Sequence, residues 1–271
     1  MSLVFCESYY EVDPTLEEVK QEICNLVGLP EIKTQLETIV EKITDASEYE
    51  SGGFTVIPPK PFHMVFVGNN GTGKSIVAQI LGKLFYLAGA LTSYTVTEMQ
   101  GNQKMKNAEG GVLLVNIDEE DPINSKTLEE IIAAMDEGST SVIFAGNHKA
   151  LNQYMKFNNE LYKRFSARFQ FDDLTCEDLA MIMHRKANKV EDNLLCGLEL
   201  DALCSAENIA QIIAQVTPEN LRSMLNAHLL DQMLIEAKKL TDELGENAIS
   251  LRDLGIGIEK GAQIYKNLLN M

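Results

Sequence analysis

Long apolar runs and paired cysteines are both missing from this chain of 271 residues. No apolar stretch approaches the roughly 20 residues that a membrane-spanning helix needs, so no membrane span is predicted. The five cysteines are scattered, form no CxxC pair and are odd in number, which argues against a disulfide framework or a zinc site and favours a reducing compartment. The four histidines show no ligand spacing, so no metal site built on histidine is predicted.

Basic residues are also scarce: 23 lysines and arginines stand against 40 aspartates and glutamates, a net charge of −17. A surface of this sign repels phosphate backbones, so nucleic acid is not expected as a partner, although a local basic channel inside a ring would be compatible with the composition. The first 14 residues lack arginine and lack a basic segment followed by an apolar stretch. They predict neither a secretory signal nor a transit peptide, and the expected location is the cytoplasm or another reducing compartment, an organelle stroma included.

Hydrophobic residues make up 45% of the chain, enough for a real core, and their spacing changes along it. Short apolar runs alternate with helical patterns in the first part, which predicts a parallel sheet covered on both faces. The strands are expected at residues 62–67, 94–97, 112–117, 141–145 and 168–171, with helices at 16–24, 31–46, 76–88 and 126–135. Beyond Asp172 the expected elements are helices at 175–188, 199–215, 218–243 and 258–270, with at most a short strand near Ser250. The chain thus divides into an N-terminal arm (1–24), an α/β domain (25–173) and a smaller helical domain (174–271).

A glycine-rich segment follows the first predicted strand. Gly68-Asn-Asn-Gly-Thr-Gly-Lys-Ser75 matches the pattern G-x-x-x-x-G-K-[ST], with an apolar strand before it and a helical pattern after it. Glycines let backbone N–H groups turn inward around phosphate oxygens, and the following helix directs its positive dipole end at the same anion. Lys74 is expected to reach the β- and γ-phosphates, and the Ser75 hydroxyl to ligate Mg²⁺. The segment therefore predicts an ATP-binding P-loop.

Four acidic residues follow the apolar strand expected at 112–117. In a P-loop ATPase, an aspartate at the end of such a strand holds Mg²⁺, and the next glutamate polarises the attacking water. Asp118 and Glu119 are chosen for these roles, although Glu120 and Asp121 directly after them leave the register open by one residue. The alternative interpretation of the four acids is a solvated loop.

Together these segments resemble AAA+ ATPases and, more narrowly, the CbbX group of red-type Rubisco activases with the related stage V sporulation protein K-like ATPases. The resemblance spans about residues 20–255 and is carried by Leu26–Leu29 with Ile32-Lys33, Phe62–Ser75, Gly110–Leu114 leading to Asp118-Glu119, Val142–Gly146, Leu161–Phe171 and Glu219–Ser223. It implies a five-stranded parallel P-loop sheet between helices, followed by a helical lid domain. It also implies that the chain hydrolyses ATP with Mg²⁺ in a hexameric ring, homomeric or mixed, and remodels a protein partner, with Rubisco as one candidate.

The resemblance further implies roles for individual residues. Asn147 falls at the sensor-1 position, where a polar side chain orients the γ-phosphate or the attacking water. Arg164 falls where the family has an arginine finger that reaches the neighbouring subunit's site, with Arg168 as the alternative, and Arg222 matches the sensor-2 arginine of the lid. For both Arg164 and Arg222 the plain alternative is a surface cation. The expected nucleotide-binding residues are Leu26, Val27, Gly28 and Leu29 around the adenine, then Asn70, Gly71, Thr72, Gly73, Lys74, Ser75, Ile76 and Arg222.

Two further segments need an interpretation of their own. Residues 98–109 are short where the family has a helix preceded by a pore loop with an aromatic residue, so Met99 and Met105 are the only candidates there for gripping a peptide. Gly255–Gly261 resembles a nucleotide loop in composition but follows no convincing strand, and it is expected to be a turn and a helix start.

Three functional hypotheses remain open at this point. The main one is an AAA+ ring ATPase that remodels a protein. The second is a nucleotide-binding regulatory subunit with weak turnover in a mixed ring, which the short segment 98–109 motivates. The third is a P-loop kinase for a small molecule, and the C-terminal position of the helical region with Arg222 argues against it.

Overall fold

The computed structural model describes residues 13–51, 62–119, 123–157, 159–188, 199–244 and 248–269. A five-stranded sheet forms the centre of its first part, in the order β2-β3-β4-β1-β5, and every pair of neighbours is parallel. The strands are β1 (Met64–Val67), β2 (Val96–Gln100), β3 (Val112–Ile117), β4 (Ser141–Gly146) and β5 (Ala167–Gln170). All five predicted strands are present, with ends that differ from the prediction by a few residues at most.

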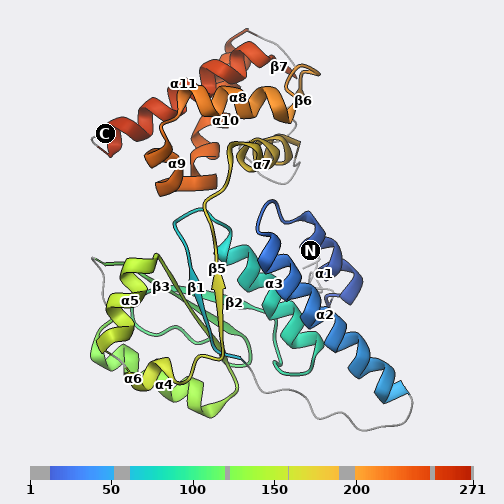
Figure 1. Ribbon diagram of the computed structural model, residues 1–271, viewed down its shortest axis with the longest axis vertical. Coiled ribbons are helices and arrows are strands. Elements are labelled where there is room, and N and C mark those ends of the chain that lie inside the picture. Colours follow the sequence, from blue (N-terminus) through green and yellow to red (C-terminus); the bar gives the residue numbers. More distant parts are fainter. Residues whose placement is uncertain are drawn as a thin grey trace, which may run out of the picture.

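The two faces of the sheet are covered by different helices (Figure 1). One face carries α1 (Leu16–Asn25), α2 (Pro30–Ser51) and α3 (Lys74–Leu87), and the other carries α4 (Ser125–Glu137), α5 (His148–Phe157) and the short α6 (Asn159–Tyr162). Side chains of a strand alternate between the two faces, so a sheet covered on both sides needs continuous apolar strands. In β1 this alternation is direct: Met64 and Phe66 pack in the α1–α3 cluster, and Val65 and Val67 pack in the α4–α6 cluster.

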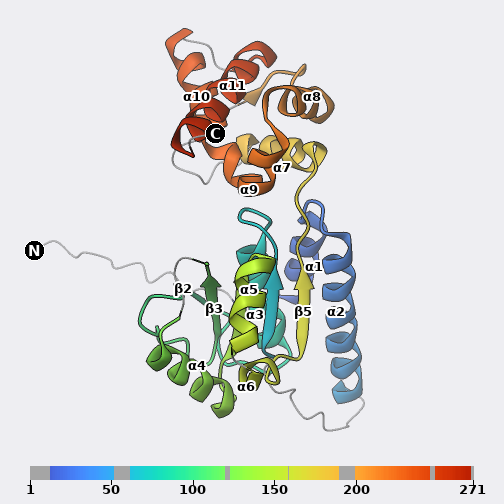
Figure 2. The ribbon, with the colours of Figure 1, turned by 60° about the vertical axis from the view of Figure 1, so that its left-hand side comes forward.

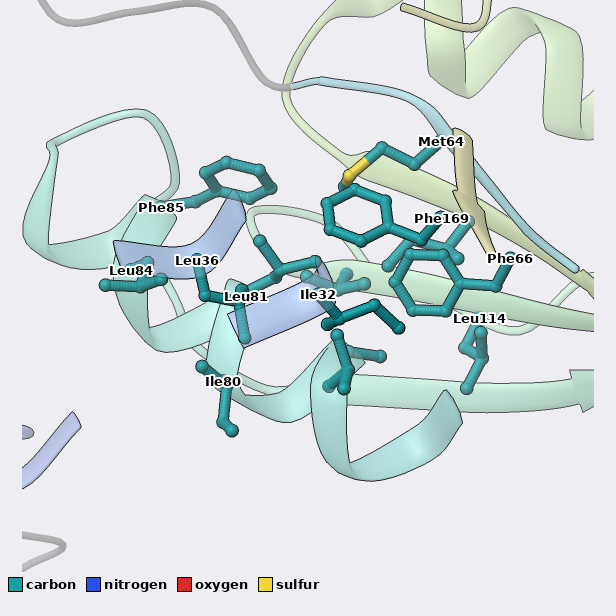
Figure 3. Packing of buried hydrophobic residues seen from close by; sticks show 14 of the residues in the cluster. Ile32, Leu36, Met64, Phe66, Ile80, Leu81, Leu84, Phe85, Leu114 and Phe169 are labelled. Atoms are coloured by element: carbon teal, nitrogen blue, oxygen red, sulfur yellow. The ribbon is translucent and has the colours of Figure 1, made fainter. Parts of the chain in front are cut away.

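The α1–α3 face holds the larger hydrophobic cluster (Figure 3). Phe66 is fully buried there and its ring lies 5.3 Å from that of Phe169 and 5.0 Å from that of Phe171, centroid to centroid. Val19 and Ile23 of α1 are buried in the same cluster, and a capping box between Thr15 and Glu18 begins this helix. Residues 16–24 of the predicted arm are thus a helix packed on the α/β domain.

The helical domain has its own hydrophobic cluster, which begins at Leu174. It lies beyond the carboxyl ends of the strands (Figure 1 and Figure 2). Its elements are α7 (Cys176–Asn188), β6 (Glu199–Leu200), α8 (Ala206–Val216), α9 (Glu219–Leu225), the 3₁₀ helix η1 (Asn226–His228), α10 (Leu229–Leu244), β7 (Ala248–Ile249) and α11 (Leu251–Leu268). The change of cluster between Phe171 and Leu174 coincides with the predicted boundary at residue 173, although the three-part division of the chain stays a prediction.

Three predicted helices of this domain have different bounds. The helix predicted at 199–215 begins only at Ala206, because residues 199–200 pair with β7 as a short strand and Ser205 then caps α8. The helix predicted at 218–243 is interrupted by η1, where Asn226 has a positive φ of 44°. The helix predicted at 258–270 begins at Leu251, where Ser250 is its N-cap.

Gly255–Gly261 was expected as a turn and a helix start, and that prediction is wrong: the segment lies inside α11. Its glycines allow a close approach of two helices. A Cβ added at Gly257 would lie 2.6 Å from Ala237 Cβ, and one added at Gly261 would lie 2.8 Å from Met233 Cα, both on α10. Packing against α10 therefore outweighs the low helix propensity of glycine.

The short segment after β2 folds back along the exposed edge of the sheet. The Lys106 ammonium donates to the Glu98 carbonyl at 2.6 Å, and the Thr97 hydroxyl donates to the Asn107 carbonyl at 3.5 Å. Met99 is buried and Met105 packs partly buried against the same α4–α6 cluster. Met99 is therefore not available to grip a peptide, because its side chain is buried in the core, whereas the same suggestion for the partly buried Met105 stays a prediction.

Candidate nucleotide-binding site

The P-loop connects the carboxyl end of β1 to the start of α3. Gly71 has φ of 73° and Gly73 has φ of 95°, the left-handed backbone that favours glycine. A Cβ on Gly68 would lie 2.4 Å from the Phe171 carbonyl oxygen, so this position also has no room for a side chain. The Thr72 hydroxyl is buried and donates to the Asn69 carbonyl at 2.8 Å. The loop that the sequence pattern predicts is thus held by backbone geometry and by a core residue.

Lys74 begins α3, and its ammonium group turns back into the loop. It donates to the Gly68 carbonyl at 2.9 Å and to the Asn69 carbonyl at 2.5 Å. Burial lowers the pKa of Lys74 to about 8, and the nearby Asp173 carboxylate opposes this shift. An ammonium group that has lost part of its hydration, at the start of a helix, favours the binding of an anion. A phosphate would supply the negative partner that stabilises the charged lysine.

The segment expected around the adenine is the turn between α1 and α2. Leu29 Cδ1 would lie 3.6 Å from a Cβ added at Gly73, so the turn touches the P-loop. Helix α7 of the helical domain lies against its other side: the carboxylate of Asp178 would be 3.2 Å from a Cβ added at Gly28, and the Arg185 guanidinium donates to the Asn25 carbonyl. Leu26–Leu29 therefore lie between the P-loop and α7, where a base could be enclosed by both domains.

Asp118 and Glu119 follow β3 directly and are exposed. The Asp118 carboxylate accepts a hydrogen bond from the Glu119 backbone N–H at 2.6 Å, and the Glu119 carboxylate accepts one from Lys149. In the register of the sheet, Ile117 pairs with Gly146, which pairs with Val67. Asp118 and Gly68, the first P-loop residue, therefore both lie one position beyond this row of paired residues. Glu120 and Asp121 lie outside the described residues.

Asn147 follows β4, the strand between β1 and β3. Its side-chain oxygen accepts a hydrogen bond from the Ala150 N–H at 2.8 Å, which caps α5. The carboxyl ends of β1, β4 and β3 thus bring the P-loop, Asn147 and the pair Asp118-Glu119 to one end of the sheet.

Within the described residues no three His, Cys, Asp or Glu side chains are grouped so as to hold a metal ion by themselves. The hydroxyl of Ser75 and the Asp118 carboxylate are oxygen ligands of the kind Mg²⁺ takes together with nucleotide phosphates.

Arg164 lies at the opposite end of the sheet, before the start of β5. Its Nε and Nη2 donate to the two carboxylate oxygens of Asp136, both at 2.9 Å, and this ion pair lowers the pKa of Asp136. His63 lies between the two segments: the imidazole Nε2 lies 3.2 Å from the Met135 carbonyl, and the His63 carbonyl accepts from the Ser166 N–H at 2.9 Å. Because β5 and β1 are parallel, this arginine is at the far end of the strands from the P-loop of its own chain.

Arg222 is not brought to the P-loop. The guanidinium Nη1 donates to the Thr217 carbonyl and lies 3.3 Å from the Thr217 hydroxyl, so it caps the end of α8. The helical domain instead reaches the loop through residues that the sequence patterns did not indicate. Asn226 donates to the Asn70 carbonyl at 3.1 Å, and the Ala227 N–H donates to the Gly71 carbonyl at 3.2 Å. No local pattern marks these residues, because their partners are about 156 positions away.

Comparison with solved structures supports the architecture. The RuvB Holliday junction branch migration motor of Thermotoga maritima matches with a TM-score of 0.56 at 15% identity, covering 86% of this chain and 69% of that chain. The Hsp104–ADP complex of Saccharomyces cerevisiae matches with a TM-score of 0.54 at 13% identity, covering 87% of this chain and 50% of that chain. The sheet order, the P-loop and these neighbours together show that the chain has the fold of an AAA+ module.

The sequence relatives are AAA+ ATPases as well. The ESX-1 secretion system protein EccA1 of Mycobacterium tuberculosis (strain H37Rv) is 26% identical over 235 residues, which is 76% of this chain and 39% of that protein. Stage V sporulation protein K of Bacillus subtilis is 26% identical over 204 residues, 66% of this chain and 62% of that protein. The chain therefore spans less than two thirds of the length of either relative.

A family model described as a domain of unknown function, DUF8495, matches residues 173–260. This match starts where the hydrophobic cluster of the helical domain starts. Within the described residues, no helix has the length and apolar character needed to cross a membrane.

Proposed function

We propose that the chain binds MgATP at the P-loop, between the α/β and helical domains, and hydrolyses it as one subunit of an AAA+ ring that remodels a protein partner. The observation that carries this proposal is the convergence of three strand ends on one end of the sheet, with the partly buried Lys74 bonded into the P-loop. The AAA+ relatives support hydrolysis and protein remodelling in general. Rubisco remains one candidate partner, from the resemblance to the CbbX group alone.

The residues at this end of the sheet supply the parts that phosphoryl transfer needs. Backbone N–H groups of residues 70–75 and the Lys74 ammonium would hold the phosphates, and Ser75 with Asp118 would hold Mg²⁺, which neutralises phosphate charge. Glu119 would orient and deprotonate the attacking water; in this structure one of its carboxylate oxygens is paired with the exposed Lys149. Asn147 lies next to both groups in the strand order and would orient the γ-phosphate or the water.

Arg164 would act on the site of a neighbouring subunit. Its place at the far end of the strands means that it serves no site of its own chain, so in a ring it would have to reach the site of a neighbouring subunit. Arg222 would have to leave Thr217 to reach a nucleotide, so we assign it a role only after such a rotation.

The test is steady-state ATP hydrolysis against protein concentration, with Glu119→Gln beside the wild type. We expect a rate per subunit that rises with concentration, and a loss of about 10²-fold or more in the variant, because general-base catalysis contributes that much. ADP affinity should stay unchanged in Glu119→Gln and should be lost in Lys74→Ala. A wild-type rate that is near zero at every concentration, with intact nucleotide binding, would contradict the motor function.

That outcome would favour the second candidate, a nucleotide-binding regulatory subunit of a mixed ring. Two observations favour this candidate specifically. Glu119 is paired with Lys149 at the surface, and Met99 of β2 is buried in the core with Met105 packed partly buried against it. A rate that appears only after a second AAA+ subunit is added would support it.

A further inference from the structure

The linker between the two domains carries a small polar cluster that no part of the proposed chemistry uses. It consists of Asn69 in the P-loop, Asp173 in the linker, and Ser223 and Asn226 at the α9–η1 corner of the helical domain; we call it the hinge clasp. The carboxylate of Asp173 is its centre. Asp173 accepts from Asn69 Nδ2 at 3.0 Å, from Asn226 Nδ2 at 3.0 Å and from Ser223 Oγ at 2.5 Å.

Asn226 is the most constrained member of the clasp. It is fully buried, its φ is 44° and its ψ is −125°, a conformation that side chains other than glycine rarely adopt. Its side-chain oxygen accepts from the Leu174 N–H at 2.8 Å, and its amide nitrogen lies within hydrogen-bond distance of Asn70 O and Ser223 O. The amide nitrogen and the amide oxygen are both hydrogen-bonded, and a buried amide on a strained backbone is held there by its surroundings; such positions cluster at functional sites.

The clasp meets the P-loop at three consecutive residues. Asn69 contributes its side chain, Asn70 its carbonyl to Asn226, and Gly71 its carbonyl to the Ala227 N–H. A Cβ added at Gly71 would lie 2.2 Å from the Leu225 carbonyl oxygen, so loop and corner are in direct contact. The inner side of the same loop receives Lys74, which donates to Gly68 O and Asn69 O. The loop is thus bonded to the helical domain on one side and to the phosphate-binding lysine on the other.

A nucleotide phosphate would draw Lys74 away from these carbonyls and would turn the loop N–H groups inward. Turning a peptide unit moves its carbonyl as well, because the peptide is planar. The carbonyls of residues 70 and 71 are the groups that the corner holds. A change in the loop therefore changes the hydrogen bonds of the helical domain, and a displaced helical domain changes the loop.

We propose that Asn226 is a positioning residue that holds the P-loop in shape and couples its occupancy to the position of the helical domain. This inference rests on the proposed nucleotide binding, but it concerns a connection within the chain and requires neither hydrolysis nor a ring.

Asn226→Gly is the variant that tests it. Glycine adopts the backbone conformation of residue 226 without strain, so the variant removes the side-chain hydrogen bonds while it keeps the corner's geometry. Thr241→Val is the matched control: Thr241 is also buried, its hydroxyl donates to Ala237 O at 3.1 Å, and it lies on α10 away from the loop. Ser223→Ala is a milder second variant within the clasp.

Two measurements on the full chain decide the outcome. The first is the affinity for a fluorescent ADP analogue, for which we expect a loss of about tenfold in Asn226→Gly, a smaller loss in Ser223→Ala and no change in Thr241→Val. The second is amide hydrogen exchange of the nucleotide-free protein, for which we expect faster exchange in Asn226→Gly both at residues 69–72 and at residues 223–228.

An unchanged ADP affinity in Asn226→Gly would overturn the inference and leave the proposed function intact. Faster exchange at the corner alone would also overturn it, since the loop would then not depend on Asn226. If the wild type fails to bind ADP, the proposed function fails and the coupling to occupancy fails with it. The exchange measurement then decides only whether Asn226 holds the P-loop in shape, and unchanged exchange at residues 69–72 would overturn that part as well.

Discussion

The two ends of the central sheet differ in what their residues can reach. At the carboxyl end, the P-loop, Asn147 and Asp118-Glu119 follow neighbouring strands, and the helical domain contacts the P-loop. At the amino end, Arg164 is paired with Asp136 beside His63, far along the strands from the P-loop of the same chain. A parallel sheet gathers one chain's binding groups at one edge. The comparison shows that a catalytic group at the amino ends of the strands can act only on the site of another molecule.

The largest test of this comparison is Arg164→Ala. We expect ATP hydrolysis to fall by about 10³-fold or more, the contribution of an arginine finger, with ADP affinity unchanged because the residue lies away from the site of its own chain. Steady-state hydrolysis and ADP titration measure the two quantities. Arg168→Ala is the control, since Arg168 is exposed on β5. If Arg168→Ala loses activity and Arg164→Ala keeps it, the finger has been assigned to the wrong arginine.

A second test uses two glycines of nearly equal backbone, one at each end of the sheet. Gly71 has φ of 73° and touches the helical domain, whereas Gly138 has φ of 74° and a Cβ there would meet nothing within 4 Å. Gly138→Ala should cost about 1–2 kcal/mol of unfolding free energy from backbone strain alone. Gly71→Ala should cost about 1–3 kcal/mol more from the clash with Leu225 and should also weaken ADP binding. Equal effects in urea unfolding would mean that the contact with the helical domain contributes nothing.

The smallest effect concerns pH at the amino end. Burial lowers the pKa of His63 below its usual 6.5, Arg164 lowers it further, and the Met135 carbonyl and Asp136 oppose the shift. The unfolded chain takes up a proton as the pH falls through about 6.5 and the folded chain does so only at lower pH, so stability from neutral His63 is present above 6.5 and is lost below it.

The Val142 N–H donates to His63 Nδ1 at 3.1 Å. His63→Leu removes this acceptor and should therefore lower the unfolding free energy by about 1–3 kcal/mol at pH 7.5, and by less at pH 5.5. Urea unfolding at both pH values measures this difference. His148→Leu, at an exposed position, should show a difference from the wild type that is small at both pH values. A His63→Leu deficit that grows toward acid would show that the sign is wrong.

Sequence patterns predicted the elements that depend on residues close together in the chain. The five strands and the P-loop were predicted because apolar runs and glycine spacing are local features of the sequence. The predictions were wrong where contacts between distant residues determine the structure. Gly257 lies within α11 because α10 packs against it, and Met99 is buried because its side chain packs in the cluster beneath α4–α6.

The candidate site shows the same division. The places of Lys74, Asn147 and Asp118-Glu119 at the ends of elements were predictable because each follows or begins an element of known direction, and their roles stay predictions. Asp136 was not, since its role depends on Arg164, which is 28 positions away, and Asn226 was not, since its partner is 156 positions away. Arg222 matched the sensor-2 position of the family, but in this structure its guanidinium donates to the nearby Thr217 carbonyl.

The separation between Asn70 and Asn226 has a consequence for how the protein is made. Contacts between distant positions form late in folding, because the loop between them must close first. The helical domain has its own core, so the α/β domain and the helical domain can each collapse before the hinge clasp joins them. A nascent chain that has not yet emerged to residue 226 lacks the partner of its P-loop. If the chain binds nucleotide as proposed and the clasp is needed for it, nucleotide would stabilise by mass action only chains in which both domains are complete.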